Sequence, residues 1–184
     1  GQFITALAAA NPDVNYIGIE KYSSVLIRAI EKQEELQLPN LRFIRMDAED
    51  IVKVFDKEEI GRIYLNFSDP WPKSGHEKRR LTYGSFLAQY RTVMDAGKTV
   101  TFKTDNRGLF DYSLLSFEAN GWKTTDVTYD LHNSEWNAEN IVTEYISGKS
   151  VLIIRAELKW AIGVFILTYG YVFVAKIESV IGHI

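Results

Sequence analysis

Strand-like and helix-like segments alternate along most of this chain of 184 residues, and this pattern limits the possible folds more than any other feature. Apolar runs rich in β-branched and aromatic residues predict strands at 14–19, 41–46, 63–67, 99–104, 122–131 and 151–159. Helical spacing predicts helices at 3–10, 23–36, 49–55, 83–94 and 106–120. Such alternation favours an α/β fold of the Rossmann-like type, a mostly parallel sheet with helices on both faces.

An acidic residue follows four of the predicted strands: Glu20, Asp47, Asp69 and Asp105. Any one of them is explained by a helix cap or a solvated loop. Four together favour a shared crevice, because ligands of parallel sheets bind at the carboxyl ends of the strands. Glu20 stands where a carboxylate accepts hydrogen bonds from the ribose hydroxyls of a dinucleotide or an adenosyl cofactor, and the residue alone fits either.

Residues 66–80, NFSDPWPKSGHEKRR, place one carboxylate beside a dense cluster of cations. Two prolines prevent the strand from continuing, so Asp69 is expected on a rigid turn. The arrangement suits a polyanionic substrate whose reacting atom is neutral and becomes positive. The simpler alternative is a tight surface turn anchored by a packed Trp71, and residues 73–80 weigh against it.

The composition limits the partners and cofactors. A formal net charge of −3 argues against coating nucleic acid by bulk attraction, so an RNA or DNA partner requires a local patch, which 73–80 supplies. The absence of Cys excludes disulfides and thiolate metal sites, and the three His are too far apart to suggest a metal motif. We expect a single soluble domain, and a cytoplasmic location is consistent with this.

The segment NFSDPWPK at 66–73, followed by HEKRRLT at 76–82, resembles the signature of the bacterial tRNA (guanine-N7-)-methyltransferases. YIGIE at 16–20, FKTDN at 102–106, DLHNS at 130–134 and TEY at 143–145 resemble further segments of that family, in the same order. The resemblance covers roughly residues 1 to 160. It implies a class I methyltransferase that moves a methyl group from S-adenosylmethionine to N7 of a guanine in the tRNA variable loop.

The resemblance also implies roles for particular residues. Glu20 and Asp47 would hold S-adenosylmethionine, and Asp69 would lie beside the methyl donor as the catalytic carboxylate. The residues expected to contact the tRNA substrate are Lys73, Asp105, Thr143, Glu144 and Tyr145. The family's RNA-interaction loop corresponds to Gly75, His76, Glu77, Lys78, Arg79 and Arg80.

The sequence departs from the family at three places. The chain begins within a helix, so we expect a methyltransferase domain at 1–160 without the family's first strand and glycine-rich turn. Ile146 stands where the family has a Glu. Residues 161–184 form an atypical apolar tail, which is slightly short of a bilayer span and suggests a hairpin or an exposed strand. We expect no membrane association unless this tail inserts.

Two other functions remain open at this point. An RNA-binding remnant would keep the cationic segment but not the cofactor. A nicotinamide-dependent oxidoreductase would also place Glu20 on a ribose, but it needs a proton donor in the crevice and leaves 73–80 without a purpose. The expected partner is tRNA, with the chain as a monomer or a homodimer.

Overall fold

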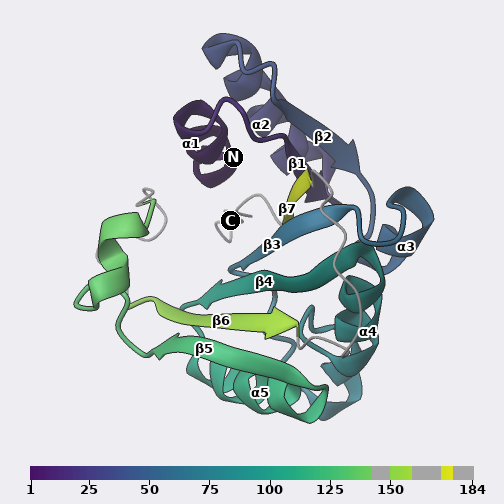
Figure 1. Cartoon of the computed structure of the whole chain (residues 1–184), viewed down its shortest axis with the longest axis vertical. Coiled ribbons are helices and arrows are strands. Elements are labelled where there is room, and N and C mark those ends of the chain that lie inside the picture. The colour runs from purple at the N-terminus through teal and green to yellow at the C-terminus, as the bar shows by residue number, and fades with distance from the viewer. Residues whose placement is uncertain (142–149, 159–170, 176–184) are drawn as a thin grey trace.

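The computed structural model describes residues 1–141, 150–158 and 171–175. Within these ranges seven strands form one sheet in the order β2-β1-β7-β3-β4-β6-β5 (Figure 1). The strands are β1 (Tyr16–Glu20), β2 (Leu41–Arg45), β3 (Ile60–Asn66), β4 (Met94–Thr104), β5 (Trp122–Thr128), β6 (Leu152–Leu158) and β7 (Tyr171–Ala175).

The sheet is mostly parallel, as the alternating pattern predicts. β1 pairs in parallel with β2 and β7, and β3 pairs in parallel with β4 and β7. Only β6 runs against its neighbours, β4 and β5. The carboxyl ends of β1, β2, β3 and β4 therefore meet at one edge, where Glu20, Asp47, Asp69 and Asp105 end or follow their strands.

β7 occupies an interior position between β1 and β3. Tyr16 pairs with Val172 on one side, and Ile63 pairs with Phe173 on the other. The apolar tail was expected to form a hairpin or an exposed strand. Its described part is instead a parallel strand that is hydrogen-bonded along both edges, and it joins the β2-β1 pair to the rest of the sheet.

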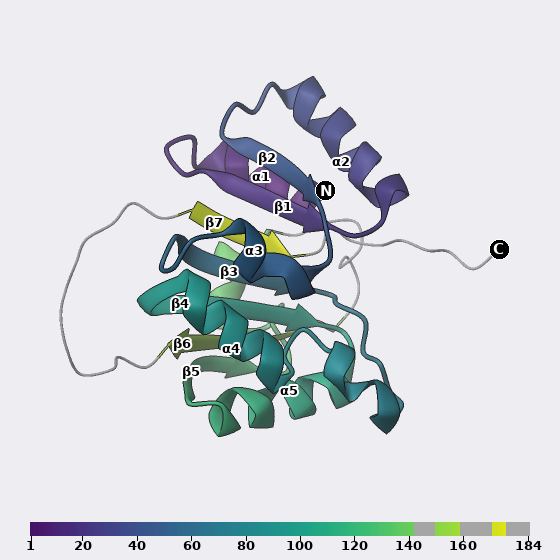
Figure 2. The same cartoon turned by 90° about the vertical axis from the view of Figure 1, so that its right-hand side faces the viewer.

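Helices cover both faces of this sheet. α1 (Gln2–Ala10) and α2 (Ser23–Leu36) lie on one face, and α3 (Ile51–Val54), α4 (Gly84–Val93) and α5 (Arg107–Ala119) lie on the other (Figures 1 and 2). The alternation of side chains along β3 explains the two layers, because Tyr64 packs on Phe3 of α1 whereas Leu65 belongs to the core beneath α4.

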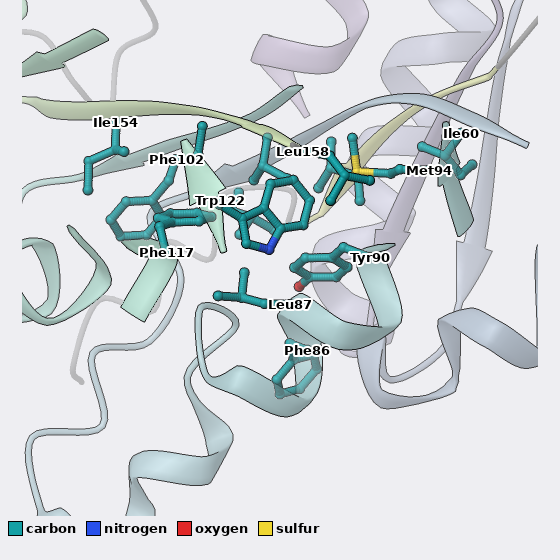
Figure 3. Packing of buried hydrophobic residues seen from close by; sticks show 14 of the residues in the cluster. Ile60, Phe86, Leu87, Tyr90, Met94, Phe102, Phe117, Trp122, Ile154 and Leu158 are labelled. Atoms are coloured by element: carbon teal, nitrogen blue, oxygen red, sulfur yellow. The ribbon is translucent and has the colours of Figure 1, made fainter. Parts of the chain in front are cut away.

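The main core fills the layer under α4 and α5. Trp122 of β5 is 1% exposed and lies against Phe117 of α5, with the ring centroids 6.1 Å apart (Figure 3). Tyr90 of α4 is also fully buried, and burial raises the pKa of its hydroxyl. These large aromatic rings, packed among aliphatic side chains, help to fix α4 and α5 on the sheet.

Two of the differences between the predicted and the observed elements concern β4 and residues 74–79. Strand β4 was expected to begin at Thr99 after a turn, but it begins at Met94, and its pairing with β3 jumps from Met94 to Thr99. Gly97, with φ of 76°, lies inside this irregular part, so the turn is a bulge within the strand. Residues Ser74–Arg79 form a 3-10 helix, η2, which the sequence analysis did not predict.

Candidate active site

A cleft of about 450 Å³ opens at the carboxyl edge of the sheet. Three of the four acidic residues at strand ends line it: Glu20, Asp47 and Asp69. Its volume lies within the range of small-molecule and cofactor sites. The other lining residues are Ile19, Lys21, Tyr22, Met46, Ala48, Glu49, Ser68, Trp71, Arg79, Leu81 and Phe86.

Glu20 is the last residue of β1 and is only 4% exposed. The backbone amide of Tyr22 donates a hydrogen bond to its Oε1 at 2.9 Å. This bond fixes the carboxylate at the base of the cleft. A carboxylate held in this way is an acceptor suited to hydroxyl donors such as those of a ribose.

Asp47 follows β2 and is linked to the end of β1. Nζ of Lys21 lies 2.6 Å from its Oδ2, and the amide of Glu49 donates to its Oδ1 at 3.1 Å. Burial alone would raise the pKa of the Asp47 carboxyl, but the hydrogen bonds from Lys21 and Glu49 outweigh it and hold that pKa below its usual value. Asp47 is therefore an anion at neutral pH.

Asp69 lies on a turn with two left-handed residues, Phe67 with φ of 52° and Trp71 with φ of 42°. Non-glycine residues adopt this conformation at a cost, and such strain gathers at functional sites. The amide of Phe67 donates to the carbonyl of Lys103 at 2.8 Å, which fixes the start of the turn on β4. These contacts give Asp69 a rigid support, as the two prolines predicted.

The side chains of Phe67 and Trp71 take different directions. Phe67 packs with Leu131, Val151 and Ile153 and does not line the cleft. Trp71 does line the cleft. It stands outside the hydrophobic clusters of the described residues, which disfavours the alternative that it anchors the turn to the core.

Two residues of the segment 73–80 flank the Trp71 ring. The guanidinium carbon of Arg79 lies 4.8 Å from the ring centroid, and the His76 ring meets it edge to face at 5.7 Å. Arg79 itself is exposed and lines the cleft. Lys73, Gly75 and Lys78 are exposed beside the cleft without lining it.

Arg80 has a different environment from Arg79. It donates from Nε to the carbonyl of Pro70 at 3.2 Å and from Nη2 to that of Trp71 at 3.0 Å. Its guanidinium carbon also lies 4.2 Å from the centroid of the Tyr112 ring on α5. Arg80 thus fixes the turn of Asp69 to a helix of the core.

The end of the segment is fixed to α5 as well. Oγ1 of Thr82 lies 2.7 Å from Oγ of Ser113, and Oγ of Ser116 donates to the carbonyl of Thr82 at 2.6 Å. All three residues are buried. The cationic segment is therefore fixed at both ends, by the turn that carries Asp69 and by the contacts of Thr82 with α5.

Some of the predicted site residues are not part of this cleft. Asp105 follows β4 and is exposed, but it does not line the cleft. Thr143, Glu144 and Tyr145 lie outside the described residues. Conversely, Lys21, Tyr22, Leu81 and Phe86 line the cleft although none was a predicted site residue. Leu81 lies within the segment 76–82, and the signal for Lys21 and Tyr22 is their adjacency to Glu20.

Neither a metal site nor a membrane span is found in the described parts of the chain. No group of three or more His, Asp or Glu side chains there is arranged to hold a metal ion. No helix within the described ranges is long and apolar enough to cross a bilayer.

Two solved structures with a similar fold are methyltransferases by name. The 16S rRNA methyltransferase KamB superposes with a TM-score of 0.60 at 14% identity, covering 86% of this chain and 83% of KamB. A SAM-dependent methyltransferase from Aquifex aeolicus superposes with a TM-score of 0.53 at 12% identity, covering 78% of this chain and 69% of the other. At these identities the likeness shows the fold alone, that of class I methyltransferases.

Sequence relatives are far closer. A family model described as "Putative methyltransferase" matches residues 1–151. The tRNA (guanine-N(7)-)-methyltransferase of Lachnoclostridium phytofermentans is 60% identical over 145 residues, which are 79% of this chain and 68% of that protein. The enzyme of the same name from Bacillus subtilis is 51% identical over 163 residues, which are 87% of this chain and 76% of that protein. This chain therefore belongs to the tRNA (guanine-N(7)-)-methyltransferase family.

Proposed function

We propose that this chain transfers the methyl group of S-adenosylmethionine to N7 of a guanine in the variable loop of tRNA. The observation that carries the proposal is the cleft itself, in which Glu20, Asp47 and Asp69 line one cavity together with Arg79 of the cationic segment 73–80. Family membership supports the same reaction.

The acidic side of the cleft fits the nucleoside part of the cofactor. Glu20 is buried and oriented by the amide of Tyr22, so it suits the ribose hydroxyls, and the Asp47 carboxylate next to it suits the donors of an adenosyl group. S-adenosylmethionine, when bound there, supplies an electrophilic methyl group. Ile19, Met46 and Phe86 provide the apolar surface that such a ligand buries.

Asp69 then acts on the base. N7 of guanine is an acceptor with a free lone pair, so no proton has to be removed before it attacks a methyl group. The purine becomes cationic as the methyl arrives, and a fixed carboxylate nearby stabilises the transition state more than the ground state. The strained turn and the Arg80 hydrogen bonds keep Asp69 in place for this role.

The cationic segment would bind the RNA backbone, and its residues have different roles in this binding. Lys73, Lys78 and Arg79 are exposed and available to phosphates, as RNA contacts usually require. Trp71, flanked by Arg79 and His76, offers a ring face on which an unstacked base can lie. We assign Arg80 to positioning the turn, because its guanidinium is already bonded to two main-chain carbonyls.

The test is methyl transfer from labelled S-adenosylmethionine to an unmodified tRNA transcript, followed by nucleoside analysis. A second transcript carries adenine in place of each guanine of the variable loop. Label in 7-methylguanosine with the first transcript and its loss with the second support the proposal. Label retained in the second transcript would contradict the variable-loop assignment, and no label despite tRNA binding would favour the RNA-binding remnant.

A further inference from the structure

A second cavity, of about 220 Å³, lies on the α1 face of the sheet. It is bounded by α1, by strands β3, β4 and β6, and by residues at and just beyond η3 (Glu135–Glu139). In Figure 1, α1 and η3 stand on the same side of β3 and β4, opposite α4. The cavity shares no described lining residue with the active-site cleft.

Lys103 of β4 lines this cavity and is only 6% exposed. Its Nζ donates to Oδ1 of Asn140 at 2.6 Å and lies 5.0 Å from the centroid of the Phe3 ring. No ion pair between described residues includes Lys103. Burying an ammonium group destabilises the folded state unless an anion compensates its charge, so this site favours the binding of an anion.

Burial, together with the nearby positive charge of Arg155, lowers the pKa of Lys103 to about 8. Strongly shifted groups of this kind are typical of functional sites, although structural sites produce them too. A bound anion would reverse the shift by favouring the charged form.

The rest of the lining supplies hydrogen-bond donors of the same character. Arg62 and Arg155 line the cavity; Arg62 Nη1 donates to the hydroxyl of Tyr64 at 3.2 Å, and Arg155 Nη1 lies 3.1 Å from Oδ2 of Asp126. Among the described residues that line the cavity, none is acidic. Three cations from three adjacent strands thus surround one small space.

The residue beside Lys103 in the neighbouring strand has unsatisfied polar atoms. Asn66 of β3 pairs with Lys103 in the strand register, so both side chains leave the same face of the sheet. Asn66 is 2% exposed, and neither its Oδ1 nor its Nδ2 has a hydrogen-bond partner within the described part of the chain. Buried polar atoms of this kind normally have a partner. Asn66 does not itself line the cavity, so its unsatisfied atoms describe the polar surface next to Lys103 and not the cavity wall.

We propose that this second cavity is a phosphate-binding site, in which Lys103 together with Arg62 and Arg155 holds the phosphoryl oxygens. Guanidinium and ammonium groups are the side chains that bind phosphate most strongly. The phosphate can belong to a small molecule or to an RNA backbone, since both present the same oxygens. Neither Lys103 nor the two arginines takes part in the methyl transfer proposed above.

The test is calorimetric titration of the whole chain with inorganic phosphate at constant ionic strength, so that general screening does not change. We expect saturable binding, weakened at least about tenfold by Lys103→Met, because one charged hydrogen bond is lost. Arg62→Gln should weaken it in the same direction. Lys57→Met is the matched control, since Lys57 is exposed, does not line the cavity and pairs with its neighbour Glu58.

A parallel titration with dimethyl phosphate separates the two sources. This monoanionic diester resembles an RNA backbone phosphate, so Lys103-dependent binding of both compounds assigns the site to RNA, and binding of inorganic phosphate alone assigns it to a small molecule. Absence of saturable binding at millimolar phosphate overturns the proposal. Equal affinity of wild type, Lys103→Met and Arg62→Gln overturns it as well.

Discussion

Nη2 of Arg80 donates a hydrogen bond to the carbonyl oxygen of Trp71 at 3.0 Å, so a cation of the segment 73–80 holds the turn that carries Asp69. Arg79, its neighbour in sequence, instead faces the cleft beside the Trp71 ring. Two adjacent arginines of one motif therefore differ in their surroundings: Arg80 is half-buried and bonded to the turn, and Arg79 is exposed at the cleft.

This difference is measurable in the kinetics. Arg79→Ala should weaken tRNA binding with little change in kcat. The logarithm of the association constant for tRNA should also fall less steeply with the logarithm of the salt concentration, by about 1 in the slope. Arg80→Ala should lower kcat, because the turn loses two hydrogen bonds, while the salt slope changes little. Identical salt slopes and kcat values for the two variants would refute the assignment.

Asp69→Asn should lower kcat by about 100-fold, on the order of 3 kcal/mol of transition-state stabilisation, by analogy with other preorganised groups. The affinity for tRNA should stay close to that of the wild type, because Lys73, Lys78 and Arg79, which we propose to bind tRNA phosphates, are unchanged. Single-turnover methylation and filter binding measure the two quantities separately. Asp56→Asn, an exposed carboxylate that precedes β3, is the control and should leave both unchanged; near-normal turnover by Asp69→Asn would exclude the catalytic role.

Replacement by Gly usually destabilises a protein more than replacement by Ala, and the strained backbone at Phe67 predicts the opposite order. Phe67→Ala removes the ring contacts but leaves a side chain at φ of 52°, whereas Phe67→Gly removes the ring and tolerates that angle. The Gly variant should therefore be the more stable of the two, by roughly 1 kcal/mol. Urea unfolding of both variants decides the point, and a more stable Ala variant would show that the turn is not strained.

Lys103 predicts a pH-dependent stability. Its pKa is lowered from 10.5 to about 8, so between these values the unfolded chain binds more protons than the folded one, and stability rises with pH. The destabilisation is fully present below pH 8 and is lost as the pH rises toward 10.5. Lys103→Met should therefore be more stable than wild type at pH 7 in phosphate-free buffer, by up to about 3 kcal/mol, and the difference should shrink by pH 9.5.

The measurement is urea unfolding of wild type and Lys103→Met at pH 7, 8 and 9.5. The charged and titratable groups that line the same cavity are Arg62, Tyr64, Arg155 and Tyr16. All four are retained in both proteins, so the difference reports Lys103. A constant difference in stability across this pH range would contradict the shifted pKa.

Much of the fold could be predicted because local signals and tertiary structure agree. The helix at 106–120 is an example: Asn106 caps it by accepting a hydrogen bond from the amide of Leu109, and its helical residues are Arg107–Ala119. Helix α2 spans the predicted range, 23–36. The carboxylates at strand ends were predicted to share a crevice because parallel strands end together, and three of the four do.

What could not be predicted depends on contacts between distant segments. The pattern of β7 indicates a strand, but no local feature says that it enters between β1 and β3. Lys103 stands in the sequence as an ordinary polar strand residue between Phe102 and Thr104, and only the approach of Phe3 and Asn140 shows it as a buried cation. The sequence does not distinguish Arg80 from the other cations of 73–80, because its hydrogen bonds to two main-chain carbonyls depend on the folded turn.

The position of β7 has a consequence for the order in which the site can be assembled. Glu20 and Asp47 belong to the β2-β1 pair, Asp69 follows β3, and the described strand that bridges these two parts comes last along the chain. During synthesis on the ribosome, both walls of the cleft would emerge before the strand that holds them together. Correct spacing of the carboxylates would then be a late event, reached only after an association between segments far apart in sequence.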